Sequence, residues 1–544
     1  MRLLIVGGVA GGASAAARAR RLSEVAEIII FERGEHVSFA NCGLPYHIGD
    51  VIKEREKLLV QTPDSLYKRF RIQTKVKTEV IKIDRVQKNI IVKNLLTGQE
   101  TKEAYDYVIL SPGADPIKPP IPGVDLPQVM TLRNLSDMDK IKIKVDQNKA
   151  KKVVVVGGGY IGLEMTEALR ERGVDVTIIE LSNQVMGPVD PEMAYYLHLE
   201  LKKHEVSLQF GVSVKGFYAK EEGVEVELSN GQKIECDDII LAIGVKPEVN
   251  LAKEAGLEIG QRGGIVVNDQ MRTNDPSIFA VGDAIEVDEF VTGTKALIPL
   301  AGPANRQGRI AADNIFGHNS FYKKTQGTAI CQLFELTIGM TGVNEKILKR
   351  LNMPFEKIYI HSNNHASYYP GATQISMKLL FDPRNGKILG AQAVGKEGVD
   401  KRIDVLAVAL RAGMTVYDLE HLELCYAPPY GSAKDLVNFL GFVAANMLKG
   451  DVANIYSEDL KPDQILLDVR SVKETQTGMI SGAINIPIDD LRDQIIQLSK
   501  DKEYIAYCQV GLRGYLACRI LTQRGFKCRN LSGGYQTYKA VKGI

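Results

Sequence analysis

Apolar and polar positions near the start of the chain predict a strand, a tight turn, a helix and a second strand. An apolar run over 2–7 enters a glycine cluster, a helical pattern follows over 13–22, and a second apolar run over 27–31 ends at Glu32. Short apolar runs bounded by glycines are typical of buried strands in parallel sheets. The glycines of the cluster are Gly7, Gly8, Gly11 and Gly12.

This order of elements is typical of a dinucleotide-binding unit. Glycines let backbone amides approach a pyrophosphate at a helix N-terminus, and an acid about 20 residues further on accepts hydrogen bonds from a ribose. Glu32 stands 20 residues after Gly12, at the expected place. Val9 is a departure, because it occupies the position of the middle glycine.

The whole unit recurs about 150 residues later. An apolar run over 152–156 precedes the glycines, and a second run over 174–179 ends at Glu180. Two copies predict two dinucleotide sites in one chain. Glu180 would repel a 2′-phosphate, which favours NADH over NADPH unless a nearby base such as Lys203 offsets it. The glycines, in full G-x-G-x-x-G spacing, are Gly157, Gly159 and Gly162.

Two later segments, 105–116 and 237–248, each predict a strand followed by a turn, and a third segment over 275–284 reads DPSIFAVGDA. Together with the two glycine fingerprints, they resemble the two-dinucleotide flavoprotein disulfide reductases over about residues 1–440. The resemblance implies FAD at the first fingerprint, NAD(P)H at the second, and a homodimer formed through a domain that follows. It also implies that Gly282 and Asp283 lie beside the flavin, and that Tyr160 and Glu164 lie near the nicotinamide.

Cys42 is the candidate redox thiol. Most members of that family carry a C-x4-C pair, whereas the segment SFANCGLPY over 38–46 holds one cysteine. A single thiolate can form a mixed disulfide, a persulfide or a sulfenic acid that reduced FAD then cleaves, and this chemistry requires a low thiol pKa. A buried structural cysteine is the alternative interpretation.

The same segment resembles the single-cysteine branch of the family, which contains coenzyme A disulfide reductases, NADH oxidases and peroxidases. The resemblance implies that coenzyme A contacts Arg18, Arg21, Ser38 and Asn41. It also implies that Tyr368 and Tyr426 of the partner subunit reach the substrate sulfur, with Tyr369 as an alternative to Tyr368. A solvated helix face is the rival explanation for the two arginines, and interface packing is the rival for the tyrosines.

A separate module follows a final helix predicted over 435–449. A strand over 504–507 runs directly into Cys508, and a glycine-containing loop ends at Arg513. Backbone amides converging on such a loop stabilise a thiolate or a persulfide. The module resembles the rhodanese domain, and its C-x4-R loop is one residue shorter than the C-x5-R loop of cysteine phosphatases, which suits a sulfane sulfur. Three further motifs match, namely DVR over 468–470, GMISGAINIP over 478–487 and LSGGY over 531–535.

The predicted fold class is α/β, with two Rossmann-like dinucleotide-binding domains, an α+β dimerisation domain and a C-terminal α/β rhodanese domain. A chain of 544 residues has room for these domains. The expected boundaries are 1–115 with 236–325 for FAD, 116–235 for NAD(P)H, 326–441 for dimerisation, 442–455 for a linker and 456–544 for the rhodanese domain.

Composition excludes several classes of protein. Lys plus Arg number 68 and Asp plus Glu 66, so a net charge of +2 gives no field that would gather nucleic acid or anionic lipid. No apolar run reaches the roughly 20 residues that span a bilayer, and the N-terminal run is too short for a signal peptide, so we expect a cytoplasmic protein. The cysteines lack C-x-x-C spacing, which argues against a disulfide framework and a metal site. Five of the seven are expected in the core, namely Cys236, Cys331, Cys425, Cys518 and Cys528.

These observations predict an FAD- and NAD(P)H-dependent reductase of persulfides, polysulfides or coenzyme A disulfides. Cys42 would attack the substrate sulfur and be resolved by reduced FAD, and Cys508 would carry sulfane sulfur. An NADH oxidase or peroxidase that cycles Cys42 through sulfenic acid is the alternative. A redox sensor or sulfur-carrier adaptor is a third interpretation.

Overall fold

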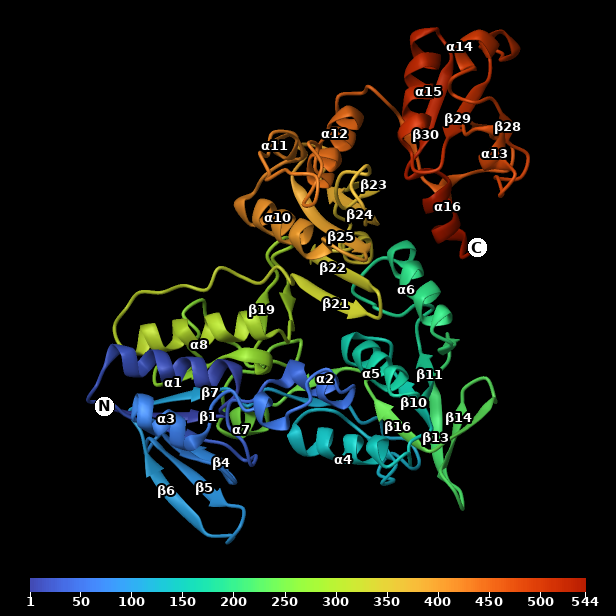
Figure 1. The fold of residues 1–544 in the computed structure, drawn as a ribbon. Coiled ribbons are helices and arrows are strands. Elements are labelled where there is room, and N and C mark those ends of the chain that lie inside the picture. The colour runs from blue at the N-terminus through green and yellow to red at the C-terminus, as the bar shows by residue number, and fades with distance from the viewer. The chain divides into compact units, whose positions relative to one another are not determined.

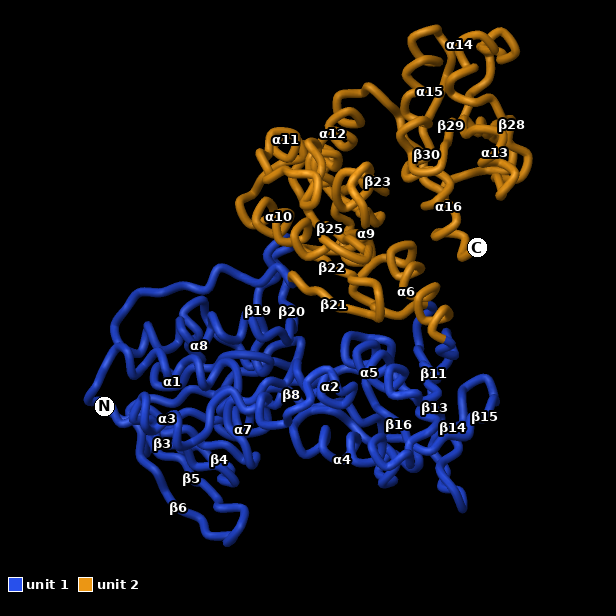
Figure 2. Tube along the Cα trace, viewed as in Figure 1, with its two compact units in different colours: residues 1–183, 205–327 blue, residues 184–204, 328–544 orange.

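The computed structural model describes residues 1–544 (Figure 1). The chain forms two compact units, of which the first comprises 1–183 and 205–327 and the second 184–204 and 328–544 (Figure 2). The predicted α/β class is confirmed by two parallel sheets in the first unit and by an antiparallel and a parallel sheet in the second.

The first sheet is parallel, and the predicted strand over 27–31 is confirmed within it. The helix after the glycine loop, α1 (Ala10–Leu22), begins three residues earlier than predicted and packs beside α8 (Ala301–Ile315). A Cβ on Gly308 of α8 would lie 2.2 Å from the Gly11 carbonyl oxygen, so only glycine permits this approach. The strands, in sheet order, are β18 (Ile278–Ala280), β7 (Tyr107–Leu110), β1 (Arg2–Val6), β2 (Glu27–Phe31) and β3 (Gln73–Lys75).

The second sheet repeats this arrangement around the helix α5 (Tyr160–Glu171). The two crossing segments pair with each other as the antiparallel strands β8 (Ala114–Pro116) and β17 (Val245–Pro247). The second sheet's strands, in order, are β12 (Ser207–Phe210), β11 (Asp175–Glu180), β10 (Lys152–Val156), β16 (Asp238–Leu241) and β9 (Val129–Met130).

The second unit contains an antiparallel sheet against which α10 (Val399–Ala412) and α12 (Leu436–Leu448) pack. The helix predicted over 435–449 is observed as α12, and Asp435 caps its N-terminus. Gly441 inside it has a packing reason, since a Cβ there would lie 2.6 Å from the Glu420 amide nitrogen. The strands, in order, are β21 (Ala329–Leu333), β22 (Leu336–Gly342), β25 (Ile388–Gly395), β24 (Gln374–Phe381) and β23 (Glu356–Asn363).

The helix α6 (Pro191–Lys203) belongs to this second unit, although its residues fall within the range expected for the second dinucleotide-binding domain. Buried charges explain its position. Lys378 of β24 lies 2.8 Å from Asp190 and 2.5 Å from Glu192 at the start of α6, and it also bonds Glu345. These contacts join α6 to the antiparallel sheet through a lysine that is fully buried.

A parallel sheet forms the C-terminal domain, with α15 (Leu512–Gln523) and α16 (Gly534–Lys542) packed on it. Residues 442–448 still belong to α12 and 454–455 already belong to this sheet, so only 449–453 of the expected linker connects the domains. The two ring nitrogens of His361 are hydrogen-bonded to the hydroxyl groups of Ser376 and of Thr537 in α16, each at 2.8 Å. These bonds hold α16 against β23 and β24. The strands, in order, are β26 (Asn454–Ile455), β30 (Lys527–Leu531), β29 (Glu503–Tyr507), β27 (Ile465–Asp468) and β28 (Ile484–Asn485).

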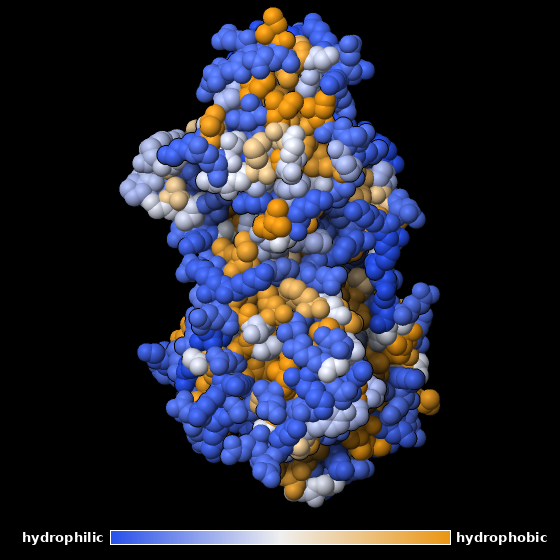
Figure 3. Space-filling model, turned by 90° about the vertical axis from the view of Figure 1, so that its right-hand side faces the viewer, coloured by the Kyte–Doolittle hydropathy of each residue, from blue (hydrophilic) through white to orange (hydrophobic).

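Smaller elements complete the fold. No helix combines the length and the apolar character that crossing a membrane requires. Figure 3 shows a face on which hydrophilic residues separate patches of apolar ones. The remaining strands are β4 (Thr78–Asp84), β5 (Asn89–Asn94), β6 (Glu100–Ala104), β13 (Val214–Ala219), β14 (Val224–Leu228), β15 (Lys233–Cys236), β19 (Val287–Asp288) and β20 (Lys295–Ala296). The remaining helices are α2 (Leu44–Ile48), α3 (Pro63–Phe70), α4 (Leu135–Asp146), α7 (Asn250–Glu254), α9 (Glu345–Arg350), α11 (Val416–Glu420), α13 (Val472–Thr475) and α14 (Leu491–Gln494).

Candidate functional site

The first glycine loop has the geometry of a phosphate cradle. Gly7 adopts φ +91°, and a Cβ on Gly12 would lie 1.9 Å from the Gly7 carbonyl oxygen. The Glu32 carboxylate accepts the Gly8 N–H at 3.0 Å, which places the acid beside the loop. Val9, the departure from the glycine pattern, is the residue directly before α1, and Gly159 is the equivalent residue before α5.

The second glycine loop repeats these features closely. Gly157 adopts φ +107°, and a Cβ on Gly162 would lie 1.9 Å from the Gly157 carbonyl oxygen. The Glu180 carboxylate accepts the Gly158 N–H at 2.8 Å. No atom lies within 4 Å of a Cβ placed on Gly159, so the space above the loop is open to a ligand. Both loops therefore fit a dinucleotide pyrophosphate with an acid at the ribose.

Cys42 lies in an exposed turn, Asn41–Gly43, directly before α2. The Ser38 N–H donates to the Gly8 carbonyl at 2.9 Å, so the segment is held to the first glycine loop. At the other end, α2 packs on α5, where a Cβ on Gly49 would lie 3.2 Å from Ala168. The cysteine segment is thereby held between the two dinucleotide-binding units.

Two acids influence the Cys42 thiol. Although the residue is exposed overall, partial burial of its sulfur is the largest factor that raises the pKa of Cys42, and the charges of Glu164 and Asp283 raise it further. Burial also raises the pKa of the Glu164 carboxyl to about 7. The low thiol pKa required by the predicted chemistry is therefore not produced by these groups, because the nearby protein charges are negative.

The structure brings Tyr368 and Tyr426 together. Their hydroxyl oxygens are 3.0 Å apart and both side chains are exposed, whereas Tyr369 packs edge-on against His365. The hydrogen bond to Tyr426 raises the pKa of Tyr368, which keeps its proton available for donation. This contact distinguishes Tyr368 from its neighbour.

The two predicted substrate arginines differ in their surroundings. The Arg18 Nε lies 2.5 Å from the Oδ1 of the buried Asp313, so its charge is already paired. Arg21 is exposed, as is Asn41 beside Cys42, whereas Ser38 is half-buried. Sequence analysis had no signal for the Asp313 pair, because the two residues are 295 positions apart.

Cys508 lies fully buried at the end of β29, inside a loop that other backbone groups hold closed. The Gly511 N–H donates to the Cys508 Sγ at 3.2 Å, and the Tyr535 N–H donates to the Cys508 carbonyl at 2.8 Å. A Cβ on Gly534 would lie 2.4 Å from that carbonyl oxygen. The LSGGY motif therefore supports the loop directly.

The buried Arg470 of the DVR motif supports the same loop. Its guanidinium pairs with Asp468 at 2.6 Å, lies 4.5 Å from the centre of the Tyr535 ring, and donates to the side chain of Gln509 at 3.2 Å. These contacts fix Tyr535 and the loop residue next to Cys508.

Glu474 is a loop partner that sequence analysis missed. Both of its carboxylate oxygens bond the Arg513 guanidinium, at 2.6 and 2.7 Å. That guanidinium also interacts with Cys508, and these partners together raise the Arg513 pKa. The available signal was the S-x-x-E capping box that Ser471 and Glu474 form at the start of α13.

The other cysteines are mostly in the core, as predicted. Cys236, Cys331, Cys518 and Cys528 are buried, and the last two have sulfur atoms 3.0 Å apart. Cys425 is exposed, so the prediction for this residue was wrong. It lies just before Tyr426 in a stretch without regular secondary structure, where the preceding apolar residues do not form a buried strand.

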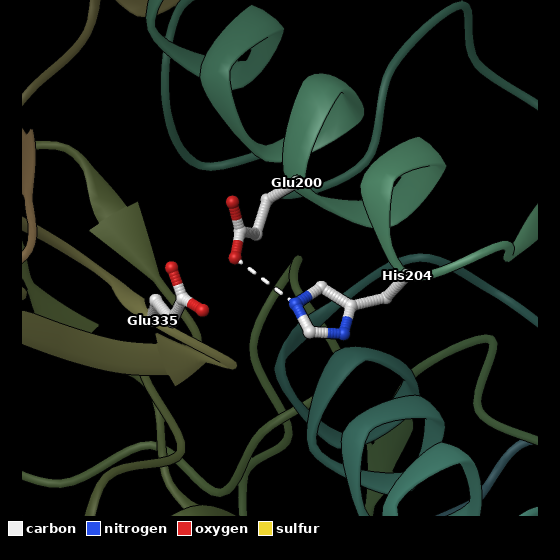
Figure 4. A group of neighbouring side chains, drawn as sticks. All are labelled: Glu200, His204 and Glu335. Carbon is white, nitrogen blue, oxygen red and sulfur yellow. Dashed lines mark hydrogen bonds and ion pairs between the residues drawn. The ribbon is translucent and has the colours of Figure 1, made fainter.

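Two side-chain groups have the composition of a metal site. Figure 4 shows Glu200 of α6 and His204, the residue directly after α6, turned toward Glu335. Lys203 lies 3.3 Å from Glu200 and 2.7 Å from Glu335, and Lys396 lies 2.9 Å from Glu335. The second group is the set of carboxylates around Lys378. Because lysines already neutralise the carboxylates, both groups are ion-pair networks.

Comparison with known proteins agrees with this geometry. The family model for pyridine nucleotide-disulphide oxidoreductases matches residues 1–308. The chain belongs to the pyridine nucleotide-disulphide oxidoreductase family. The dimerisation domain of the same family matches 328–436, and the rhodanese-like domain matches 452–541. The chain is thus a flavoprotein disulfide reductase fused to a rhodanese domain, and its family implies FAD and NAD(P)H.

Three relatives of this pyridine nucleotide-disulphide oxidoreductase are informative. Reduced CoADR-RHD of Bacillus anthracis is 52% identical, with a TM-score of 0.97 over 99% of this chain and 98% of that one. A NAD-dependent persulfide reductase from A. fulgidus is 37% identical, with a TM-score of 0.94 over 99% and 100%. Coenzyme A disulfide reductase of Staphylococcus haemolyticus is 37% identical over 82% of this chain and 100% of its own length.

Proposed function

We propose that the chain uses NADH to reduce persulfides or disulfides of coenzyme A, with Cys42 as the attacking thiol. The position of Cys42 carries this proposal. It is an exposed single thiol whose pKa responds both to Glu164, on the nicotinamide side, and to Asp283, on the flavin side. The influence of both acids supports a position for this thiol between the two cofactors. The names of the relatives supply the substrate class.

The glycine loops and their acids are the groups that would hold the cofactors. Glu32 would bind the FAD ribose, Asp283 the ribityl chain, and Glu180 the NADH ribose. When bound, FAD accepts a hydride from the nicotinamide and supplies the electron pair that sulfur reduction consumes. Lys203, the base considered as a partner for a 2′-phosphate, is paired with Glu200 and Glu335, which favours NADH.

The chain's residues perform the sulfur chemistry. The Cys42 thiolate attacks the substrate disulfide or persulfide, a new S–S bond forms to Sγ, and the leaving hydrosulfide or thiolate takes a proton. We assign this proton to the hydrogen-bonded Tyr368 and Tyr426, contributed by the partner subunit of a homodimer. Arg21, Ser38 and Asn41 would hold the coenzyme A, and Arg18 would join them only by leaving Asp313.

Cys508 would be the sulfane-sulfur carrier of the rhodanese domain. The Gly511 amide directed at its Sγ and the nearby Arg513 guanidinium both stabilise negative charge on sulfur. Sulfur received there would pass to coenzyme A by persulfide exchange and then be released at Cys42 as sulfide.

An anaerobic NADH titration followed by visible spectroscopy tests the reductase. We expect the flavin absorbance to bleach with NADH and to recover on adding coenzyme A persulfide or coenzyme A disulfide. The compound that restores the absorbance faster is the preferred substrate. Recovery only on admitting air would contradict the proposal and favour an NADH oxidase.

Two serine variants test the cysteine roles separately. Cys42→Ser should abolish substrate reduction while FAD stays bound, and retained reduction would refute its role. Cys508→Ser should remove sulfurtransferase activity with thiosulfate but spare the reduction of free coenzyme A persulfide. An unchanged transferase rate would refute the assignment of Cys508.

A further inference from the structure

The rhodanese domain contains a groove that the functions described above do not use. It has a volume of about 750 Å³ and runs between α15 and the segment 487–492. The α15 side of the groove is formed by Arg513, Leu516, Arg519, Ile520 and Arg524. Their spacing of three or four residues places them on one face of the helix.

Four arginines line the groove, and two of them have no carboxylate partner. Arg513 pairs with Glu474 and Arg519 pairs with Asp451, at 2.6 and 3.3 Å. Arg492 and Arg524 are exposed and form no ion pair, and the Arg524 guanidinium donates to the Arg492 carbonyl at 3.3 Å. These two arginines therefore lie at the same end of the groove without an ion-pair partner, although Asp489 also lines the groove. Guanidinium groups in such a position suit phosphate.

The opposite end of the groove reaches the Cys508 loop. Arg513 lines the groove and also interacts with Cys508. Val469, another lining residue, donates its N–H to the Tyr507 carbonyl at 2.9 Å, one residue before Cys508. Along α15 the distance from Arg513 to Arg524 is about 16 Å, from the rise of 1.5 Å per residue.

Apolar side chains also line the groove. They are Leu516 and Ile520 of α15 with Pro487 and Ile488, and Leu516 is 43% exposed. The groove thus joins a sulfur-binding loop to two unpaired arginines past exposed apolar side chains that can contact an organic ligand. A small inorganic anion cannot occupy both ends, whereas a thiol on a long arm that ends in phosphates can.

We propose that this groove binds a phosphorylated thiol, with coenzyme A as the representative, and presents its sulfur to Cys508. The proposal rests on the sulfane-carrier role of Cys508. In the reaction the thiolate of the bound ligand attacks the outer sulfur of the Cys508 persulfide. A new S–S bond forms in the ligand, the bond to Sγ breaks, and the Cys508 thiolate leaves and takes a proton. Sulfane sulfur moves without net oxidation, so no other reagent is required.

A single-turnover comparison of coenzyme A with pantetheine tests the groove. Full-length protein without NADH is loaded at Cys508 with thiosulfate, freed of excess donor, and mixed with either acceptor. Pantetheine has the same thiol arm but lacks the nucleotide phosphates. We expect Arg492→Ala/Arg524→Ala to raise the acceptor concentration for half-maximal transfer about tenfold for coenzyme A and to leave transfer to pantetheine unchanged.

The control variant is Lys461→Ala/Lys502→Ala, which removes the same charge from exposed positions of the domain outside the groove. It should behave like the wild type with both acceptors. Equal loss with coenzyme A and pantetheine, no loss with coenzyme A, or the same loss in the control variant would overturn the proposal. Failure of the wild-type protein to load Cys508 would instead overturn the carrier role and the groove's function with it.

Discussion

At the scale of single residues, the chemistry of Cys42 depends on the charges around it. Its turn brings the thiol near Glu164 and Asp283, and both carboxylates favour the neutral thiol. Glu164 has a pKa raised by burial to about 7, so its charge changes within the physiological range. The thiolate population of Cys42 should therefore depend on the ionisation of Glu164.

We expect Glu164→Gln to lower the pKa of Cys42. Because Glu164 is ionised mainly above pH 7, the variant's Cys42 should alkylate faster than that of the wild type above this pH, and the two rates should converge below it. The rate is measured with iodoacetamide and peptide mass spectrometry. Glu171→Gln, at the exposed end of α5, is the control. Superimposable pH profiles for Glu164→Gln and wild type would rule out this coupling.

The Cys508 loop offers a second test at this scale. Gly534→Ala should abolish sulfurtransferase activity while leaving the NADH-dependent reduction intact, because its Cβ would lie 2.4 Å from the Cys508 carbonyl oxygen. Gly543→Ala is the matched control, because both glycines have a positive φ, +72° at Gly543 and +63° at Gly534. A Cβ placed on Gly543, however, would have no atom within 4 Å. Equal activity losses would show that backbone conformation alone, and not the contact with the loop, is responsible.

At the scale of elements, buried charges position α6. Lys378 bonds Asp190, Glu192 and Glu345. Burial alone would lower the pKa of this lysine, but the charges of the three acids outweigh burial and raise the pKa strongly. The lysine therefore remains charged throughout the pH range in which the protein is folded. Removing a lysine of this kind leaves carboxylates buried without a counter-ion.

Lys378→Met should destabilise the second unit by about 3–5 kcal/mol, the usual result of removing one partner from a buried ion pair. Urea unfolding followed by circular dichroism measures the change. Lys203→Met removes an exposed lysine, which pairs with the exposed Glu335 as well as with the buried Glu200, and should have a much smaller effect. Similar midpoints for the two variants would contradict a structural role for the buried cluster.

At the scale of the whole molecule, we propose that a second chain completes the site. Cys42 belongs to one compact unit, whereas the tyrosine pair belongs to the other. The dimerisation domain provides a route by which a partner could supply the tyrosines. This arrangement can be examined by mixing two inactive variants.

Co-expressed Cys42→Ser and Tyr368→Phe/Tyr426→Phe chains should recover about a quarter of wild-type reductase activity, because half of the dimers are mixed and each contains one intact site. NADH oxidation with coenzyme A persulfide measures the recovery. Each variant alone gives the baseline. Activity no higher than these baselines would show that the tyrosines act within their own chain.

The sequence alone determined the features that depend on neighbouring residues. Both glycine loops, their terminal acids Glu32 and Glu180, and the C-x4-R loop of Cys508 are local patterns, because a turn and the start of a helix are defined by a few consecutive residues. Buried strands such as 27–31 and 152–156 also came directly from apolar runs. These patterns were sufficient to predict the fold class and the family.

Only the tertiary structure decided which distant residues meet. The pairing of Arg18 with Asp313, of Tyr368 with Tyr426 and of Arg513 with Glu474 joins positions 295, 58 and 39 residues apart. The same holds for the position of α6 and for the groove along α15. Such contacts arise when separate elements pack, and their partners leave no periodic signal in the chain. Packing therefore determined the environment of each site, while local sequence determined its chemistry.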